Sequence, residues 1–402
     1  MHRWRRLPHL NSYLGASSRR VFSTGRTVES VDVRCGSSGH VTVDLHNFSN
    51  LGPDEPIIVN FPSLPANTVA SPIKLPTFLH GLPVATIHYR WDGLSPERFS
   101  VLPNNDKLAY APWPTPVHDA AFAFSWLSAA FSPVKCARRS VYVYGSFLGA
   151  SLASSLALTE SHPHARFSVR GFMAYNGIYN WTMFLPDHRV NRSTTRGGRT
   201  ITRQQPQEGS HLHFLQEHMP SLFGRPSNLF DAFASPSLLF HSPGLLVPRS
   251  FTMTIADAAA MDSMIAKDTS VTIKPKTPRK SRLVFPPRKS TLKLPEALLM
   301  HESSPTLLTA LGKPPKRKLK GSGNSFQAQA AELAELMRHS INVVELGERK
   351  KWDDDMHEII DKASSRVKTL DVGEGVADYE LGATGETPAL AWLQCRGFMR
   401  RF

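Results

Sequence analysis

Side chains that could support nucleophilic catalysis occur in the central part of the chain. Ser146 lies between Gly145 and Gly149 in the run Gly-Ser-Phe-Leu-Gly, where the glycines favour a tight turn. A serine becomes a nucleophile when a neighbouring base takes its proton and a further group orients that base. The candidate bases and the candidate acid are His118, His301 and Glu302. Ser146 is therefore a candidate nucleophile for covalent catalysis.

Metal and cofactor chemistry is less well supported. The three closely spaced histidines are His211, His213 and His218, and no cysteine or aspartate is spaced to complete a zinc set. The cysteines (Cys35, Cys136 and Cys395) are too few and too scattered for a disulfide framework. We therefore expect no cofactor, no metal and a reducing compartment.

The net charge of +14 is concentrated in two segments of the 402-residue chain. Residues 1–28 contain six arginines and no acid, and residues 274–320 contain 13 basic and two acidic residues. The remainder is close to neutral, so a basic footprint for nucleic acid over the whole surface is not expected. Weak contact with rRNA or an anionic membrane surface is expected through the cations Lys313, Lys316, Arg317, Lys318 and Lys320.

The N-terminal segment has the composition of a mitochondrial transit peptide, because it is rich in arginine and serine and lacks acids. Arg20-Val21-Phe22-Ser23 resembles the site cut by matrix processing peptidases. We expect residence in the mitochondrial matrix. No apolar run approaches the roughly 18 residues of a membrane-spanning helix, so no transmembrane segment is expected.

Strand-like and helix-like segments alternate along the chain. The predicted strands are 28–35, 40–46, 56–61, 82–91, 140–144, 169–175, 297–301 and 341–346. The predicted helices are 116–131, 150–160, 326–339 and 352–367. The first two strands form a hairpin, and strands separated by such helices form parallel crossovers. The expected fold class is α/β, with a mostly parallel central sheet flanked by helices.

Composition divides the chain into one domain with additions. The expected boundaries are a transit peptide or disordered segment at 1–27, a domain at 28–370 and a tail at 371–402. Within the domain we expect a lid-like insertion at 185–225 and poorly ordered basic stretches at 266–295 and 311–324.

The order of these elements resembles the α/β-hydrolase fold, in particular the esterase/lipase branch typified by hormone-sensitive lipase. The run Trp113–Asp119, which leads into a helix containing Trp126 and Leu127, is similar to the helix before the nucleophile in that branch. Asp231–Pro236 is similar to a segment that follows its sixth strand. The resemblance covers about residues 40–370 and implies the fold more strongly than the activity.

The resemblance also implies positions for the catalytic groups, and this chain departs from them. The family's nucleophile stands at the centre of Gly-x-Ser-x-Gly, which is Phe147 here. The family's catalytic aspartate corresponds to Ser304, with Glu302 as a possible substitute. After the expected last strand, Gly347–Trp352 contains no histidine, and the next is His357.

The segment that would supply oxyanion-binding N–H groups, Asn60–Pro65, contains two prolines. Two hypotheses follow. The first is a degenerate hydrolase that binds a partner or an apolar ligand without cleaving it. The second is an esterase that uses Ser146, with His118 or His301 as base.

Overall fold

The computed structural model describes most of the chain. The described residues are 17–23, 26–49, 51–66, 74–94, 111–133, 137–191, 194–196, 199–201, 206, 208–265, 277–303, 323–347, 359–373 and 379–398. Among them, no helix is long and apolar enough to span a bilayer.

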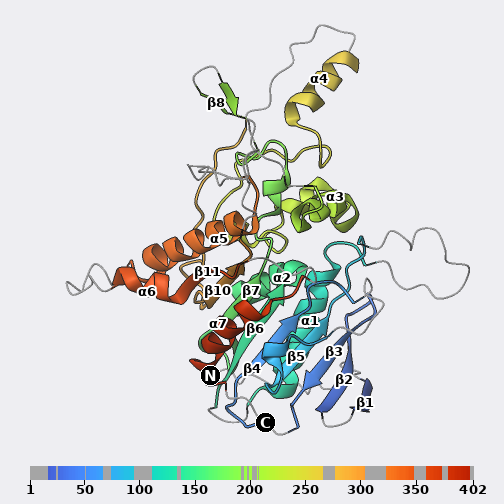
Figure 1. The fold of residues 1–402 in the computed structure, drawn as a ribbon, viewed down its shortest axis with the longest axis vertical. Helices are drawn as coiled ribbons and strands as arrows, with labels where there is room; N and C mark the ends of the chain where they lie inside the picture. Colours follow the sequence, from blue (N-terminus) through green and yellow to red (C-terminus); the bar gives the residue numbers. More distant parts are fainter. Residues whose placement is uncertain are drawn as a thin grey trace, which may run out of the picture.

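A nine-stranded sheet forms the centre of the molecule, in the order β1-β2-β3-β5-β4-β6-β7-β10-β11 (Figure 1). Its strands are β1 (Ser17–Ser23), β2 (Arg26–Arg34), β3 (His40–His46), β4 (Ile57–Phe61), β5 (Val84–His88), β6 (Arg139–Ser146), β7 (Phe167–Tyr175), β10 (Glu296–His301) and β11 (Val367–Asp371). Pairing is antiparallel from β1 to β5 and parallel from β5 to β11. The predicted hairpin and the mostly parallel sheet are therefore confirmed.

Helices cover both faces of the sheet. The α-helices are α1 (Thr115–Phe131), α2 (Phe147–Thr159), α3 (His211–Phe223), α4 (Ile255–Ile265), α5 (Phe326–Ser340), α6 (Ile359–Arg366) and α7 (Ala383–Gln394). Successive side chains of a strand point to opposite faces. In β4, Val59 packs in the core that contains residues of α1, α2 and α5, whereas Ile58 packs in the core that contains residues of α7.

The segments above the carboxyl ends of the parallel strands are largely irregular (Figure 1). They contain α3, α4, a separate hairpin of β8 (Thr194–Arg196) and β9 (Arg199–Ile201), and 3₁₀ turns η3 (Trp181–Phe184), η4 (Pro226–Phe230) and η5 (Pro236–Leu239). A further turn, η1 (Thr77–Leu79), lies on the α7 face. The expected insertion at 185–225 therefore contains α3 and the small hairpin.

Side chains of the two sequence segments that resemble the lipase branch meet each other. Trp113 Nε1–H donates to Asp231 Oδ2 at 3.2 Å. Asp119, which is fully buried, accepts from Arg90 Nη2 at 2.6 Å and from Arg90 Nε at 3.0 Å. This bidentate pair joins the start of α1 to the residues after β5.

The C-terminal part of the sheet differs from the sequence prediction. Ile341–Glu345 is not the last strand but a π-helix, η6, that continues α5. The last strand is β11, which pairs in parallel with β10. Residues 371–402 are not a simple tail, because Trp392 and Leu393 of α7 are buried against the sheet.

Two segments predicted to be disordered contain ordered structure. Ser17–Ser23 forms β1, which pairs with β2 along its whole length, and the predicted processing site lies within it. Residues 277–295 have no regular secondary structure, but Leu283 N–H donates to the Phe240 carbonyl and Lys293 N–H donates to the Ser161 carbonyl. The prediction of poor order is therefore wrong for these described residues.

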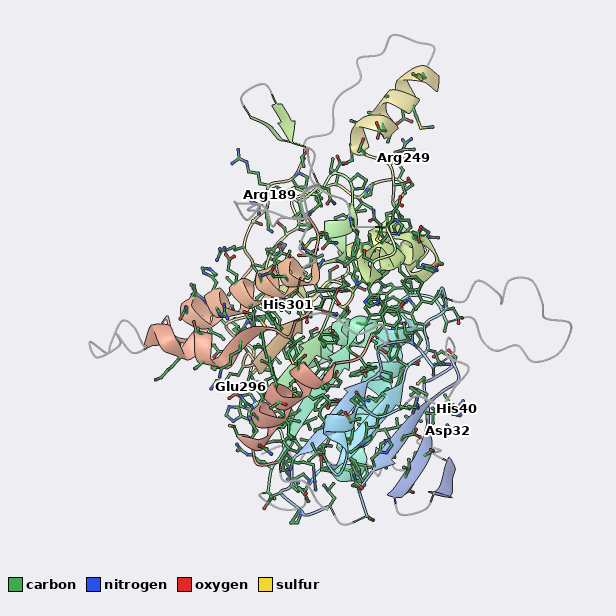
Figure 2. The ribbon with its side chains drawn as sticks, in the orientation of Figure 1. Asp32, His40, Arg189, Arg249, Glu296 and His301 are labelled. Carbon is green, nitrogen blue, oxygen red and sulfur yellow. The ribbon has the colours of Figure 1, made fainter. Side chains whose placement is uncertain are left out.

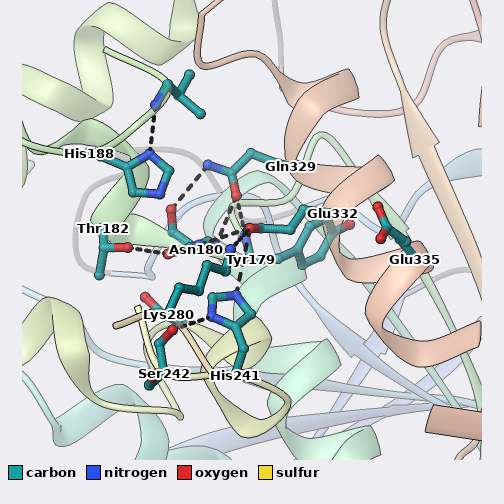
Figure 3. Close-up of polar contacts among 12 residues, drawn as sticks. Tyr179, Asn180, Thr182, His188, His241, Ser242, Lys280, Gln329, Glu332 and Glu335 are labelled. Atoms are coloured by element: carbon teal, nitrogen blue, oxygen red, sulfur yellow. Dashed lines mark hydrogen bonds and ion pairs between the residues drawn. The ribbon is translucent and has the colours of Figure 1, made fainter. Parts of the chain in front are cut away.

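A buried polar network attaches the upper segments to α5 (Figure 3). Gln329 Oε1 accepts from the N–H groups of Tyr179 and Asn180 at 3.1 and 2.9 Å. Asn180 Nδ2 donates to Glu332 Oε2 at 2.8 Å, and Lys280 Nζ lies 3.1 Å from Glu332 Oε1. One turn of α5 thus satisfies backbone groups that follow β7 and would otherwise be buried without partners.

Two titratable groups of this region have strongly shifted pKa values. Burial alone would raise the pKa of the Glu332 carboxyl, but its polar neighbours and the Lys280 charge lower it to about 2. Burial lowers the pKa of the His188 imidazole to about 4, and the neutral ring accepts from Val190 N–H at 3.3 Å. The folded state therefore holds a neutral His188 close to an ionised Glu332.

Acidification from pH 7 to pH 5 should reduce the free energy of unfolding by about 2 kcal/mol through His188. Because its pKa is depressed in the folded state, the unfolded chain takes up the proton first, and stability is lost between about pH 6.5 and pH 4. Urea unfolding at the two pH values measures this loss, which should shrink by about 2 kcal/mol in His188→Gln. His164→Gln, at an exposed histidine, is the control. Equal pH dependence of wild type and His188→Gln would contradict the buried neutral ring.

Candidate functional site

The junction of β6 and α2 is a sharp strand-to-helix elbow. β6 ends at Ser146, and α2 begins at Phe147. Phe147 has φ = 50°, in the left-handed region that a bulky side chain adopts only at a cost. The predicted turn at 145–149 is therefore present, and Phe147 stands at its apex.

Both glycines of the elbow are required by close backbone packing. A Cβ atom on Gly145 would lie less than 3.0 Å from the Gly149 carbonyl oxygen. A Cβ atom on Gly149 would lie less than 3.0 Å from the carbonyl oxygens of Phe61 and Pro62, at the end of β4. Contacts this short are sterically forbidden, so the first turn of α2 can rest on β4 only with glycine at these positions.

Aromatic rings cover the apex of the elbow. Phe147 is fully buried, and its ring centroid lies 4.6 Å from that of Tyr379. His211, at the start of α3, lies 4.4 Å from Tyr379 between ring centroids, and Phe326, at the start of α5, lies 6.3 Å from Phe147. The position that an elbow normally presents to a substrate is therefore part of a packed aromatic cluster.

The loop after the true last strand contributes two residues that the sequence prediction missed. Tyr379 and Glu380 follow β11, and Tyr379 stacks on Phe147. The family resemblance predicts a histidine in the loop after the last strand, and in this structure that strand is β11. The run Gly347–Trp352 follows a π-helix and not the last strand of the sheet. His357 lies outside the described residues.

The Ser146 side chain does not share the position of Phe147 at the apex of the elbow. Its side chain lies on the same face of β6 as Tyr144, which packs in the core on the α7 face. Ser146 is fully buried, and its Oγ donates to Glu380 Oε2 at 3.2 Å. The hydroxyl is thus paired with a carboxylate, on the opposite face of the strand from α2.

The candidate bases do not meet Ser146. His118 is exposed on α1. His301 ends β10, which is two strands from β6 and therefore about 10 Å away between backbones (Figure 2). The Nδ1 atom of His301 lies 3.0 Å from the carbonyl oxygen of Glu302. Neither imidazole is positioned to take a proton from the serine.

The candidate acid is engaged locally. Glu302 Oε2 accepts from Asn176 Nδ2 at 3.1 Å, and Glu302 N–H donates to Asn176 Oδ1 at 2.9 Å. The next residue, Ser303, donates from Oγ to Asp371 Oδ1 at 2.6 Å and helps to lower the pKa of that carboxyl. Ser304 lies outside the described residues. Glu302 therefore fixes the turn after β7 and does not orient a base.

The N–H groups that could bind an oxyanion belong to Leu148 and to the segment Asn60–Pro65. In hydrolases of this fold, the residue after the nucleophile donates its N–H to the oxyanion. Here that residue is Leu148, whose N–H donates to the Ser63 carbonyl oxygen at 3.2 Å. The flanking Pro62 and Pro65 have no N–H to contribute. The Leu148 N–H is therefore engaged within the protein, and two residues of the segment 60–65 cannot donate to an oxyanion.

The histidine triplet lies on α3, not in a loop. His211 stacks on Tyr379, His213 Nδ1 lies 3.7 Å from Glu217 Oε2, and His218 Nδ1 lies 2.8 Å from the Phe214 carbonyl oxygen. Within the described part of the chain, no three histidine, cysteine or acidic side chains are grouped to hold a metal ion. The cations from Lys313 to Lys320 lie outside the described residues.

Gly149→Ala should destabilise the folded state by at least about 2 kcal/mol, because the new methyl group meets backbone carbonyls that cannot rotate away. Gly52→Ala is the matched control, since its nearest neighbours lie at ordinary contact distances of 3.6 and 3.7 Å. Urea denaturation of the two variants measures the difference. Equal stabilities would show that α2 does not rest on the end of β4 as described.

No protein-family model and no curated protein sequence matches the chain. Solved structures do resemble it. A carboxyl esterase from Tuber melanosporum has 12% identity and a TM-score of 0.46, over 93% of this chain and 86% of the other. An esterase from Pyrobaculum calidifontis has 13% identity and a TM-score of 0.43, over 92% and 83%. The carboxylesterase EstE1, cloned from a metagenomic library, has 11% identity and a TM-score of 0.46, over 95% and 88%.

From its own sheet order and strand–elbow–helix junction, the chain has the α/β-hydrolase fold.

Proposed function

We propose that this protein has lost ester hydrolysis and binds a ligand or protein partner in the mitochondrial matrix. The observation that carries the proposal is Phe147, which occupies the left-handed apex of the elbow and is fully buried under Tyr379. A phenyl ring has no atom that can attack a carbonyl carbon and form an acyl intermediate. The chemical step that the elbow normally serves therefore has no nucleophile.

The neighbouring groups support the same conclusion. Partial burial raises the pKa of the Tyr379 phenol, so this residue is not a base near neutral pH. Leu148 N–H is already bonded to Ser63. Loss of the nucleophile alone lowers kcat by about 10⁶ in a serine hydrolase, and here the oxyanion donor is also engaged. The proposed mitochondrial location rests on the arginine-rich, acid-free residues 1–28.

The alternative is a carboxylic-ester hydrolase that uses Ser146. The observation in its favour is the hydrogen bond of 3.2 Å between Ser146 Oγ and Glu380 Oε2, because a carboxylate can act as a general base. Against it stands the complete burial of Ser146.

The full-length protein should not react with a fluorophosphonate probe or hydrolyse short-chain nitrophenyl esters above the uncatalysed rate. An active serine esterase serves as positive control, and circular dichroism confirms that the sample is folded. Labelling with turnover that disappears in Ser146→Ala would establish the esterase and refute the proposal.

Phe147→Ser alone should remain unlabelled, because the ring stacked directly on this position is the Tyr379 phenol, and the His211 ring centroid lies farther away, 6.0 Å from that of Phe147. Phe147→Ser combined with Tyr379→His supplies a hydroxyl and an imidazole at two positions whose rings stack on each other in the wild type. We expect the double variant to react with the probe at least tenfold faster than either single variant. Robust hydrolysis by Phe147→Ser alone would show that another residue already acts as base.

A further inference from the structure

An apolar groove of about 180 Å³ lies beside the C-terminal half of α5, away from the elbow. Three of its lining residues expose large aliphatic side chains: Leu283 is 49% exposed, Val284 is 57% exposed and Val343 is 56% exposed. Exposed aliphatic side chains that gather around one hollow form a candidate binding surface.

The walls of the groove are held by specific contacts. On one side, Leu283 N–H donates to the Phe240 carbonyl at 2.8 Å, and the rings of Phe240 and Phe285 lie 5.1 Å apart in an edge-to-face arrangement. On the other side, Ser340 Oγ donates to the Phe285 carbonyl. The segment around 282–285 is therefore fixed against α5, and the space between them is preformed.

The π-helix η6 forms the far end of the groove. It places Val343 and Val344 among the lining residues. π-Helical turns are rare and occur often at functional sites, because they displace side chains from the regular helical positions. A β-strand at this position, as predicted from the sequence, would have directed these side chains differently.

The titratable groups that line the groove are one cation and one neutral ring. Arg282 and His339 belong to the lining. Partial desolvation and the Arg282 charge lower the pKa of His339, so this ring is neutral at pH 7 and Arg282 carries the charge. Among the described residues, the acid that pairs with Arg282 is Glu335, which lies 3.5 Å away and is 75% exposed. Such an exposed pair is weak and is readily exchanged for another carboxylate.

We propose that this groove binds a linear aliphatic carboxylate of about six to eight carbons, with the chain against Val284 and Val343 and the carboxylate on Arg282. The size follows from volume, since a cavity of about 150 Å³ accommodates the six-carbon benzene ring. The site is separate from the elbow. Leu336 is ten residues from Phe326 along α5, or about 15 Å. The proposal is therefore independent of whether the elbow hydrolyses esters.

Calorimetric titration of the full-length protein with octanoate, octanol and octylammonium tests the site. Octanoate should bind at least tenfold more tightly than octanol, and octylammonium should show no measurable binding. The absence of octanoate binding, or equal binding of the three probes, would overturn the proposal. Because no ester is present, the result does not depend on the activity assay.

Variants locate the binding. Arg282→Gln should weaken octanoate binding about tenfold and leave octanol binding unchanged, because only the carboxylate uses the guanidinium. Val343→Ser should weaken both ligands by a similar factor. The matched controls are Arg249→Gln, at an exposed arginine beside α4 (Figure 2), and Val247→Ser, at a valine that is 52% exposed. Equal effects of control and groove variants would show that octanoate binds elsewhere.

Discussion

The close backbone contact between the first turn of α2 and the end of β4 is the constraint on which the centre of the molecule depends. Gly149 lies directly against the carbonyl oxygens of Phe61 and Pro62, so there is no room for even one methyl group between the helix and the strand. The helix begins two residues earlier, at Phe147, whose backbone has the left-handed conformation. It also brings Leu148 N–H to the Ser63 carbonyl. The elbow is thus maintained by backbone packing and needs no catalytic side chain.

The same geometry explains how the residue at the apex of this elbow becomes part of the core. A side chain at the apex points up from the carboxyl edge of the sheet, toward α3, α5 and the loop after β11. A small polar side chain there would require solvent or a hydrogen-bond partner, whereas an aromatic ring is stabilised by neighbouring rings. Phe147, Tyr379 and His211 supply such rings from three separate parts of the chain. Their contact joins the upper segments to the sheet, as does the polar network around Gln329.

Local patterns in the sequence predicted most of the sheet and the elbow. The glycine pair and the alternating hairpin are signals carried by a few adjacent residues. The error at Ile341–Leu346 has a physical origin, because periodicity cannot tell a short apolar run in a strand from one in a helix, and the β-branched residues of this run favour a strand. That error shifted the expected last strand, and with it the expected position of the histidine, to Gly347–Trp352. Tyr379 and Glu380 follow β11, and only the tertiary structure brings them to Phe147 and Ser146.

Strand β1 has a consequence for any form of the protein that lacks its first 22 residues. β1 pairs with β2 from Ser17 to Ser23 and occupies the outer position of the sheet. Without most of β1, β2 becomes the outermost strand and presents a row of unpaired N–H and C=O groups. Such an open edge is a template for pairing with the same strand of a second molecule. Proteolytic trimming within this segment would thus change the tendency of the protein to self-associate, although it lies far along the sheet from the elbow.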